Sequence, residues 1–125
     1  MSNFRLAPAA VLLVLATACA PPPKPLSPTQ AIEAKELAAV DALHLRTKYK
    51  DIVMGDDVKG TTLVVYADRN NVDSMDEQAE DAMVGDTLVR WKAIWSANHP
   101  HKHAKLVVSV RDFYASQIVA QSTQV

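Results

Sequence analysis

The spacing of hydrophobic positions along the chain changes several times, and each change predicts a new element. Residues 29–39 favour a helix, because Ser27 can cap it, a proline suits its first position, and Gln30 stands where the partner of a capping box belongs. Apolar and cationic residues then alternate over 43–50, which is the period of a strand. An alternative is that the first helix continues to Leu45.

A hairpin is predicted in the middle of the chain. Residues 55–60 combine glycine, aspartate and lysine and have the chemistry of a turn. The β-branched run over 61–67 suits a central strand. We expect this strand to pair with 43–50 in antiparallel fashion.

A long helix is predicted after a loop over 68–73. Ser74 and Glu77 have the spacing of a capping box, and the helix should end near Asn98, before a proline. Winding it at 100° per residue produces two apolar stripes, and two stripes need two partners. The sheet and the first helix can cover them, or an exposed stripe can bind another protein. The first stripe comprises Met75, Ala79, Ala82, Met83, Val89, Ala93 and Ile94, and the second comprises Val84, Leu88, Trp91 and Trp95.

The last part of the chain predicts two more strands. Residues 105–113 are β-rich, and a turn at 114–116 can return the chain through 117–121 as an edge strand. The order of elements is then α-β-β-α-β-β. This order predicts an α+β domain of two layers, with a mostly antiparallel sheet and helices on one face.

The first eighteen residues differ in kind from the rest. Arg5 gives a weakly positive start, 11–15 form an apolar run, and 16–18 are small residues. This is the three-part form of a secretory signal. The apolar run is too short for a permanent membrane span, which needs about 20 residues.

The end of this segment, Leu15-Ala16-Thr17-Ala18-Cys19, resembles the lipobox of bacterial lipoproteins. The resemblance covers about twenty residues. It implies that Cys19 receives a diacylglyceryl thioether, that signal peptidase II cleaves before it, and that the new amino terminus is acylated. Cys19 is the only cysteine, so it cannot form an internal disulfide. The alternative is an ordinary secretory signal with an incidental cysteine.

The implied lipid would attach the protein to a membrane, because two or more acyl chains hold firmly where one binds marginally. By resemblance, Ala20 in the position after the cysteine favours the outer membrane, facing the periplasm. Residues 20–28 are rich in proline and predict a short, extended spacer. The predicted organisation is therefore a signal peptide over 1–18, a lipidated tether over 19–28 and one domain over 29–125.

Charge and composition narrow the function classes. Cleavage would leave 107 residues with 12 basic and 14 acidic side chains. This balance provides no basic footprint for nucleic acid. The three glycines cannot form a phosphate-binding loop, and no glycine-flanked serine marks a nucleophile elbow.

Three histidines, His99, His101 and His103, are the strongest candidate metal ligands. Alternate residues of an extended segment lie on one face, and zinc or copper accepts neutral imidazole. The structural alternative is a solvated loop between a helix and a strand. Asp68, Asn70 and Asp73 do not fit a calcium loop, and turns or helix capping explain them.

Three hypotheses follow. The leading one is a lipid-anchored, non-enzymatic periplasmic module of the cell envelope with a binding or assembly role, an envelope protein as its partner, and Trp91 and Trp95 as candidate contacts. The second is a metal-binding lipoprotein that uses the three histidines. The third is a small envelope hydrolase with dispersed catalytic residues. No cofactor is predicted beyond the lipid on Cys19 and the zinc or copper of the second hypothesis.

Overall fold

The computed structural model describes residues 24–124, so Cys19 and the first half of the predicted tether, residues 19–23, lie outside the described range. The elements in chain order are α2 (Pro28–Asp41), α3 (Leu45–Lys48), β1 (Val53–Lys59), β2 (Thr62–Ala67), α4 (Arg69–Asp73), α5 (Glu77–Asn98), β3 (Leu106–Asp112) and β4 (Ile118–Gln124). The predicted α+β class is confirmed.

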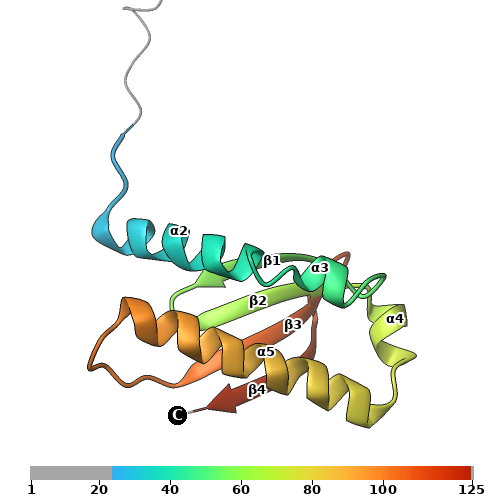
Figure 1. The fold of residues 1–125 in the computed structure, drawn as a ribbon. Coiled ribbons are helices and arrows are strands. Elements are labelled where there is room, and N and C mark those ends of the chain that lie inside the picture. Colours follow the sequence, from blue (N-terminus) through green and yellow to red (C-terminus); the bar gives the residue numbers. More distant parts are fainter. Residues whose placement is uncertain (1–23, 125) are drawn as a thin grey trace, which may run out of the picture.

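The four strands form one sheet in the order β1-β2-β3-β4. The outer pairs are antiparallel, but β2 and β3 are parallel, so the sheet is mixed. The reason is α5, whose length carries the chain back along the sheet before β3 begins. Figure 1 shows α2 and α5 side by side on the same face of the sheet. The long elements keep the predicted order, and α3 and α4 are additional short helices.

The start of α2 agrees with the sequence prediction. Gln30 donates its backbone N–H to the Ser27 hydroxyl at 3.2 Å, and Ser27 donates its own to the Gln30 side chain at 3.0 Å. This reciprocal pair is a complete capping box. It satisfies backbone donors that a helix start otherwise leaves free.

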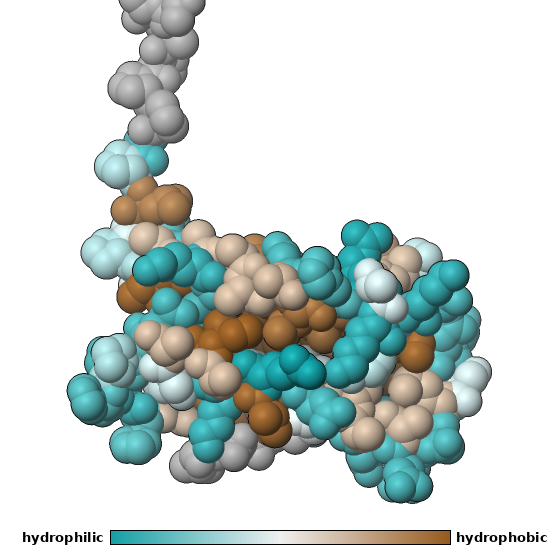
Figure 2. Space-filling view, in the orientation of Figure 1, coloured by the Kyte–Doolittle hydropathy of each residue, from teal (hydrophilic) through white to brown (hydrophobic). Residues whose placement is uncertain are grey.

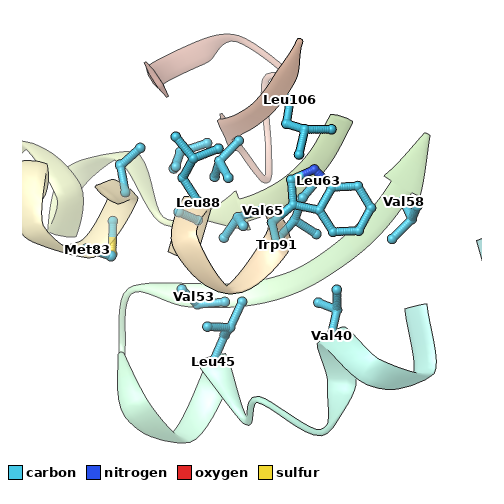
Figure 3. Packing of buried hydrophobic residues seen from close by; sticks show 14 of the residues in the cluster. Val40, Leu45, Val53, Val58, Leu63, Val65, Met83, Leu88, Trp91 and Leu106 are labelled. Atoms are coloured by element: carbon cyan, nitrogen blue, oxygen red, sulfur yellow. The ribbon is translucent and has the colours of Figure 1, made fainter. Parts of the chain in front are cut away.

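The core lies between the two long helices and the sheet. Trp91 is fully buried at its centre, and its indole N–H donates to the Thr61 carbonyl at 2.9 Å. This bond joins α5 to the turn between β1 and β2. Figure 3 shows Trp91 among Leu63, Val58 and Leu106, with Val40 and Leu45 approaching from the opposite side. In Figure 2 a hydrophobic band follows the hollow between α2 and α5.

The strand predicted over 43–50 is wrong, and so is a helix unbroken to Leu45. His44 adopts a left-handed conformation with φ 53°, which separates α2 from α3. Leu45 is buried and Tyr49 is half-buried, whereas the residues between them are exposed. The apolar positions therefore repeat at i and i+4, which is the spacing of a helical turn and not of a strand.

The turn predicted over 55–60 is also wrong, because most of these residues belong to β1. The turn is limited to Gly60, at φ 60°, and Thr61. Asp56 and Asp57 lie opposite Val65 and Val64 of β2. An edge strand tolerates such polar residues because one of its sides faces no other strand. Strand β2 forms nearly as predicted, and its hairpin partner is β1.

The long helix begins slightly later than predicted. Asp76, not Ser74, is its N-cap and accepts the Ala79 backbone N–H at 2.7 Å. The loop predicted over 68–73 contains the short helix α4, which Asp68 caps through its carboxylate. The predicted end of the helix at Asn98 and the final two strands are confirmed.

Candidate functional site

A pocket of about 290 Å³ lies at the end of the domain where α2 begins. We call it the Glu36 pocket. In Figure 1 the start of α2, the end of α5 and the loop after it meet at this end of the molecule. Helix α2 contributes Thr29, Ile32, Glu33 and Glu36, the β1–β2 turn contributes Gly60 and Thr61, and α5 with its following loop contributes Trp95, His99 and Lys102.

Glu36 is the unusual residue of this pocket. It lies between Ile32 and Val40 at spacing i−4 and i+4, on the face of α2 that packs on the core, and only 1% of it is exposed. Its Oε2 atom has no hydrogen-bond partner among residues 24–124. Burial raises the pKa of Glu36, and the charge of Glu33 raises it further, whereas His99 lowers it. A buried carboxyl oxygen without a donor is costly in a folded domain.

His99 is held in a fixed orientation at the end of α5. Its ring stacks on Trp95 with 4.3 Å between centroids and 12° between planes. Its Nδ1 lies 2.9 Å from the Trp95 carbonyl oxygen. Because a carbonyl only accepts, Nδ1 carries the proton, and Nε2 makes none of the hydrogen bonds found among the described residues.

The pocket has opposite charges on its two walls. Glu33 and Glu36 belong to α2, while His99 and Lys102 belong to the end of α5 and the loop after it. Within residues 24–124 the single ion pair joins Arg69 to Asp73, far along the chain from these groups. The charged groups of the pocket are thus available to a molecule that enters it.

A second hollow of about 590 Å³ lies between α2, α3 and β1. Asp41 and Asp56 both line it, with Arg46 nearby. Desolvation raises the pKa of Asp56 to about 6, and a hydrogen bond and the charge of Asp41 add to this effect. The hydrogen bond between the Asp56 and Asp41 side chains gives each carboxyl a partner. The second hollow therefore lacks the unpartnered group that distinguishes the Glu36 pocket.

Comparison with known protein families, with curated proteins and with solved structures finds no match to this chain. The site must be interpreted from its own geometry.

The three histidines of the predicted metal cluster are in different environments. His99 is half-buried against Trp95, whereas His101 and His103 are exposed. His101 has φ 64°, so the segment is not the extended strand that would place alternate imidazoles on one face. In the part of the chain that the structure describes, no three histidine, cysteine or acidic side chains are grouped to hold a metal ion.

Trp91 and Trp95 are covered by the protein's own elements. Their exposed fractions are 0% and 6%, and both belong to the core cluster. Of the two interpretations of the second stripe of α5, the structure favours intramolecular cover. Trp95 also lines the Glu36 pocket.

Two other predicted sites have a simple outcome. Cys19 lies outside the described residues, so its lipidation stays a prediction. Asp68 accepts the Asn70 and Asn71 backbone N–H groups and caps α4, in agreement with the capping interpretation. Over residues 24–124 no helix has the length and hydrophobicity that a membrane span requires.

Proposed function

We propose that this chain is a lipid-anchored, non-enzymatic module of the bacterial cell envelope whose domain binds a small ligand in the Glu36 pocket. Acyl chains on Cys19 would hold it on the outer membrane, facing the periplasm. The anchor rests on the Leu15–Cys19 lipobox and the proline-rich segment that follows it. The binding role rests on one observation: a buried oxygen of Glu36, in the wall of a pocket, has no hydrogen-bond partner in the described part of the chain.

The position of the pocket supports a combination of anchoring and binding. The capped start of α2 follows the proline-rich segment directly, and Thr29, in the first turn of that helix, lines the pocket. A ligand site next to the tether would stay close to the membrane to which Cys19 is attached. An assembly partner in the envelope would then meet the rest of the domain on its outer faces.

A hydrolase is the second candidate, because the pocket brings a carboxyl, an imidazole and the Thr29 hydroxyl to one place. A nucleophile needs a base within hydrogen-bond reach, and that base needs a third group to orient it. No hydrogen bond joins His99, Thr29 and Glu36 in the described structure. The Nδ1–H of His99 donates to the Trp95 carbonyl instead. The geometry therefore supports binding better than catalysis.

The anchor is tested by fractionation of cells that produce the full chain or its Cys19→Ser variant while growing on labelled palmitate. We expect the full chain in the membrane fraction with label attached, and the variant without label. A labelled full chain that requires detergent for its release supports the proposal. An unlabelled chain in the soluble fraction would refute the anchor and leave the pocket unaffected.

A further inference from the structure

The two walls of the Glu36 pocket differ in charge in a way that specifies a ligand. We propose that the pocket binds a small zwitterion that carries a primary ammonium group and a phosphate or carboxylate, with the ammonium on Glu36 and the anionic group at Lys102. This inference deepens the proposed binding function and rests on it. The chemistry of the pocket itself does not depend on the lipid anchor.

The ammonium end is defined by what Glu36 lacks. Its Oε2 accepts no hydrogen bond from any residue that the structure describes, although 99% of Glu36 is buried. An ionised carboxylate is an acceptor only, and a primary ammonium offers three N–H donors with a full positive charge. The terminal torsion of glutamate is soft, so a small rotation presents Oε2 to a ligand in the pocket. A quaternary ammonium has the same charge but no N–H donor and cannot satisfy this oxygen.

The anionic end is defined by the loop after α5. Lys102 is exposed and lines the pocket, and its ammonium makes no ion pair within the described residues. His99 presents its Nε2 from a ring that the Trp95 stack and the Nδ1 hydrogen bond keep in place. A phosphate or carboxylate accepts from the Lys102 ammonium, and it accepts from Nε2 of His99 only in the imidazolium form, in which both ring nitrogens carry a proton. The charge of each wall is then matched by one end of the ligand.

The floor and size of the pocket favour a short molecule. Trp95 and Ile32 contribute apolar surface to the lining, and the volume is about 290 Å³. This lies at the lower limit of pockets that hold small ligands. A headgroup or an amino acid fits this limit, whereas a peptide of several residues does not.

Two sources can supply this chemistry in an envelope. One is a lipid headgroup of the phosphoethanolamine type, and the other is a soluble zwitterion such as an amino acid. The eight residues 20–27 would separate an anchor at Cys19 from α2 by at most about 25 Å in polyproline geometry, so the pocket would remain near the headgroups. The experiment below separates the two sources.

The chemistry is tested by calorimetric titration of the full-length protein, solubilised in an amine-free detergent. The ligands are phosphoethanolamine and phosphocholine, which differ by the three methyl groups that replace the N–H donors. We expect phosphoethanolamine to bind at least tenfold more tightly. Equal affinity for the two, or binding of neither phosphoethanolamine nor alanine, would overturn the proposal.

Variants assign the two ends of the ligand. Glu36→Gln should weaken phosphoethanolamine binding at least tenfold, and Lys102→Ala, on an exposed loop where misfolding is not a concern, should weaken it several-fold. Glu77→Gln, an exposed carboxyl in the first turn of α5, is the matched control and should change nothing. If Glu36→Gln and Lys102→Ala both bind like the unaltered chain, the assignment of the walls is wrong.

The source is decided by reconstitution of the protein into vesicles of phosphatidylcholine with or without phosphatidylethanolamine. If the headgroup occupies the pocket, phosphatidylethanolamine should raise the apparent Kd for soluble phosphoethanolamine. If it does not, and alanine binds in detergent with the same dependence on Glu36, the ligand is a soluble zwitterion. A protein that binds in detergent but carries no lipid would refute the anchor while the ligand assignment stands.

Discussion

Two carboxyl groups lie where burial raises their pKa, Asp56 on β1 and Glu36 on α2. They differ in how their hydrogen-bonding demand is met. Asp56 has a partner in Asp41, whereas an oxygen of Glu36 has none within the described residues. The Asp41–Asp56 pair should therefore contribute to the pH dependence of stability, and Glu36 should determine ligand binding.

The pH dependence follows from the sign of the Asp56 shift. The pKa of Asp56 is 3.8 in the unfolded chain and about 6 in the folded one. As the pH rises from about 4 to about 6, the unfolded chain therefore loses its proton first, and the stability of the fold decreases. Asp56→Asn should therefore raise the free energy of unfolding at pH 7.5 by about 1 kcal/mol, a value reduced for solvent screening at this partly exposed position. Urea unfolding at pH 7.5 and pH 3.5 measures this, and the gain should vanish at pH 3.5.

The double variant provides the control. Asp41→Asn removes the repulsion but not the desolvation of Asp56, so Asp41→Asn combined with Asp56→Asn should gain no more than Asp56→Asn alone. If the two effects add, or if Asp56→Asn gains as much at pH 3.5 as at pH 7.5, the carboxyls are not paired as described.

Glu36 leads to a prediction that separates function from stability. Glu36→Met keeps the length of the side chain and removes a buried charge without a partner, so it should raise the free energy of unfolding by about 1–2 kcal/mol at pH 7. The gain should shrink in acid, where the unaltered Glu36 is protonated. Denaturant titration at both pH values measures it. A loss of stability at pH 7 would mean that the Glu36 carboxyl supports the fold and not a ligand.

The signal for Glu36 is present in the sequence but is easy to miss. Ile32, Glu36 and Val40 repeat at i and i+4, so a charged residue occupies the middle of an apolar stripe. Charged residues at such positions are rarely fully buried without a partner. The acidic and basic walls of the pocket could not be foreseen, because α2 and the loop after α5 are about 65 residues apart in the chain. Their proximity depends on the parallel crossover.

At the scale of elements, the sequence predictions were correct for those features that depend on residues close together in the chain. Three such features depend on neighbours within a few residues: the Ser27 capping box, the end of α5 before Pro100 and the β-branched run of β2. The prediction for β1 was wrong because the extended conformation of Asp56 and Asp57 depends on their cross-strand partners in β2. The strand predicted over 43–50 was wrong because the alternating pattern also fits a helical turn that buries Leu45.

The cap of α2 provides a test at this scale. Ser27→Ala should lower the free energy of unfolding by about 1 kcal/mol, because the Gln30 backbone N–H loses the Ser27 hydroxyl that accepts it. It should also weaken phosphoethanolamine binding, since the first turn carries Thr29 of the Glu36 pocket. Thermal unfolding and calorimetry measure the two effects. Ser27→Asp, which restores a capping acceptor, should recover stability, and failure to recover it would contradict this account of the helix start.

At the scale of the whole molecule, the single crossover through α5 determines the arrangement. The sequence predicted the α+β class and a mostly antiparallel sheet, and two of the three strand pairs are antiparallel, but it did not predict the parallel β2–β3 pair. Because β2 and β3 are parallel, α5 must carry the chain back to the end of the sheet at which β2 begins. This return brings the loop after α5 back beside the β1–β2 turn and the first turns of α2. The pocket is a product of this topology.

The Glu36 pocket lies at the end of the domain that follows the tether, and the proposed lipid on Cys19 is what would hold it at a membrane. Mass spectrometry of the N-terminal peptide of the protein, extracted from its native envelope, tests this lipidation most directly. We predict a chain that begins at Cys19 and carries the mass of a diacylglyceryl thioether, with a further acyl group where the amine is modified. A peptide that begins elsewhere, or a Cys19 thiol of unmodified mass, would contradict the account.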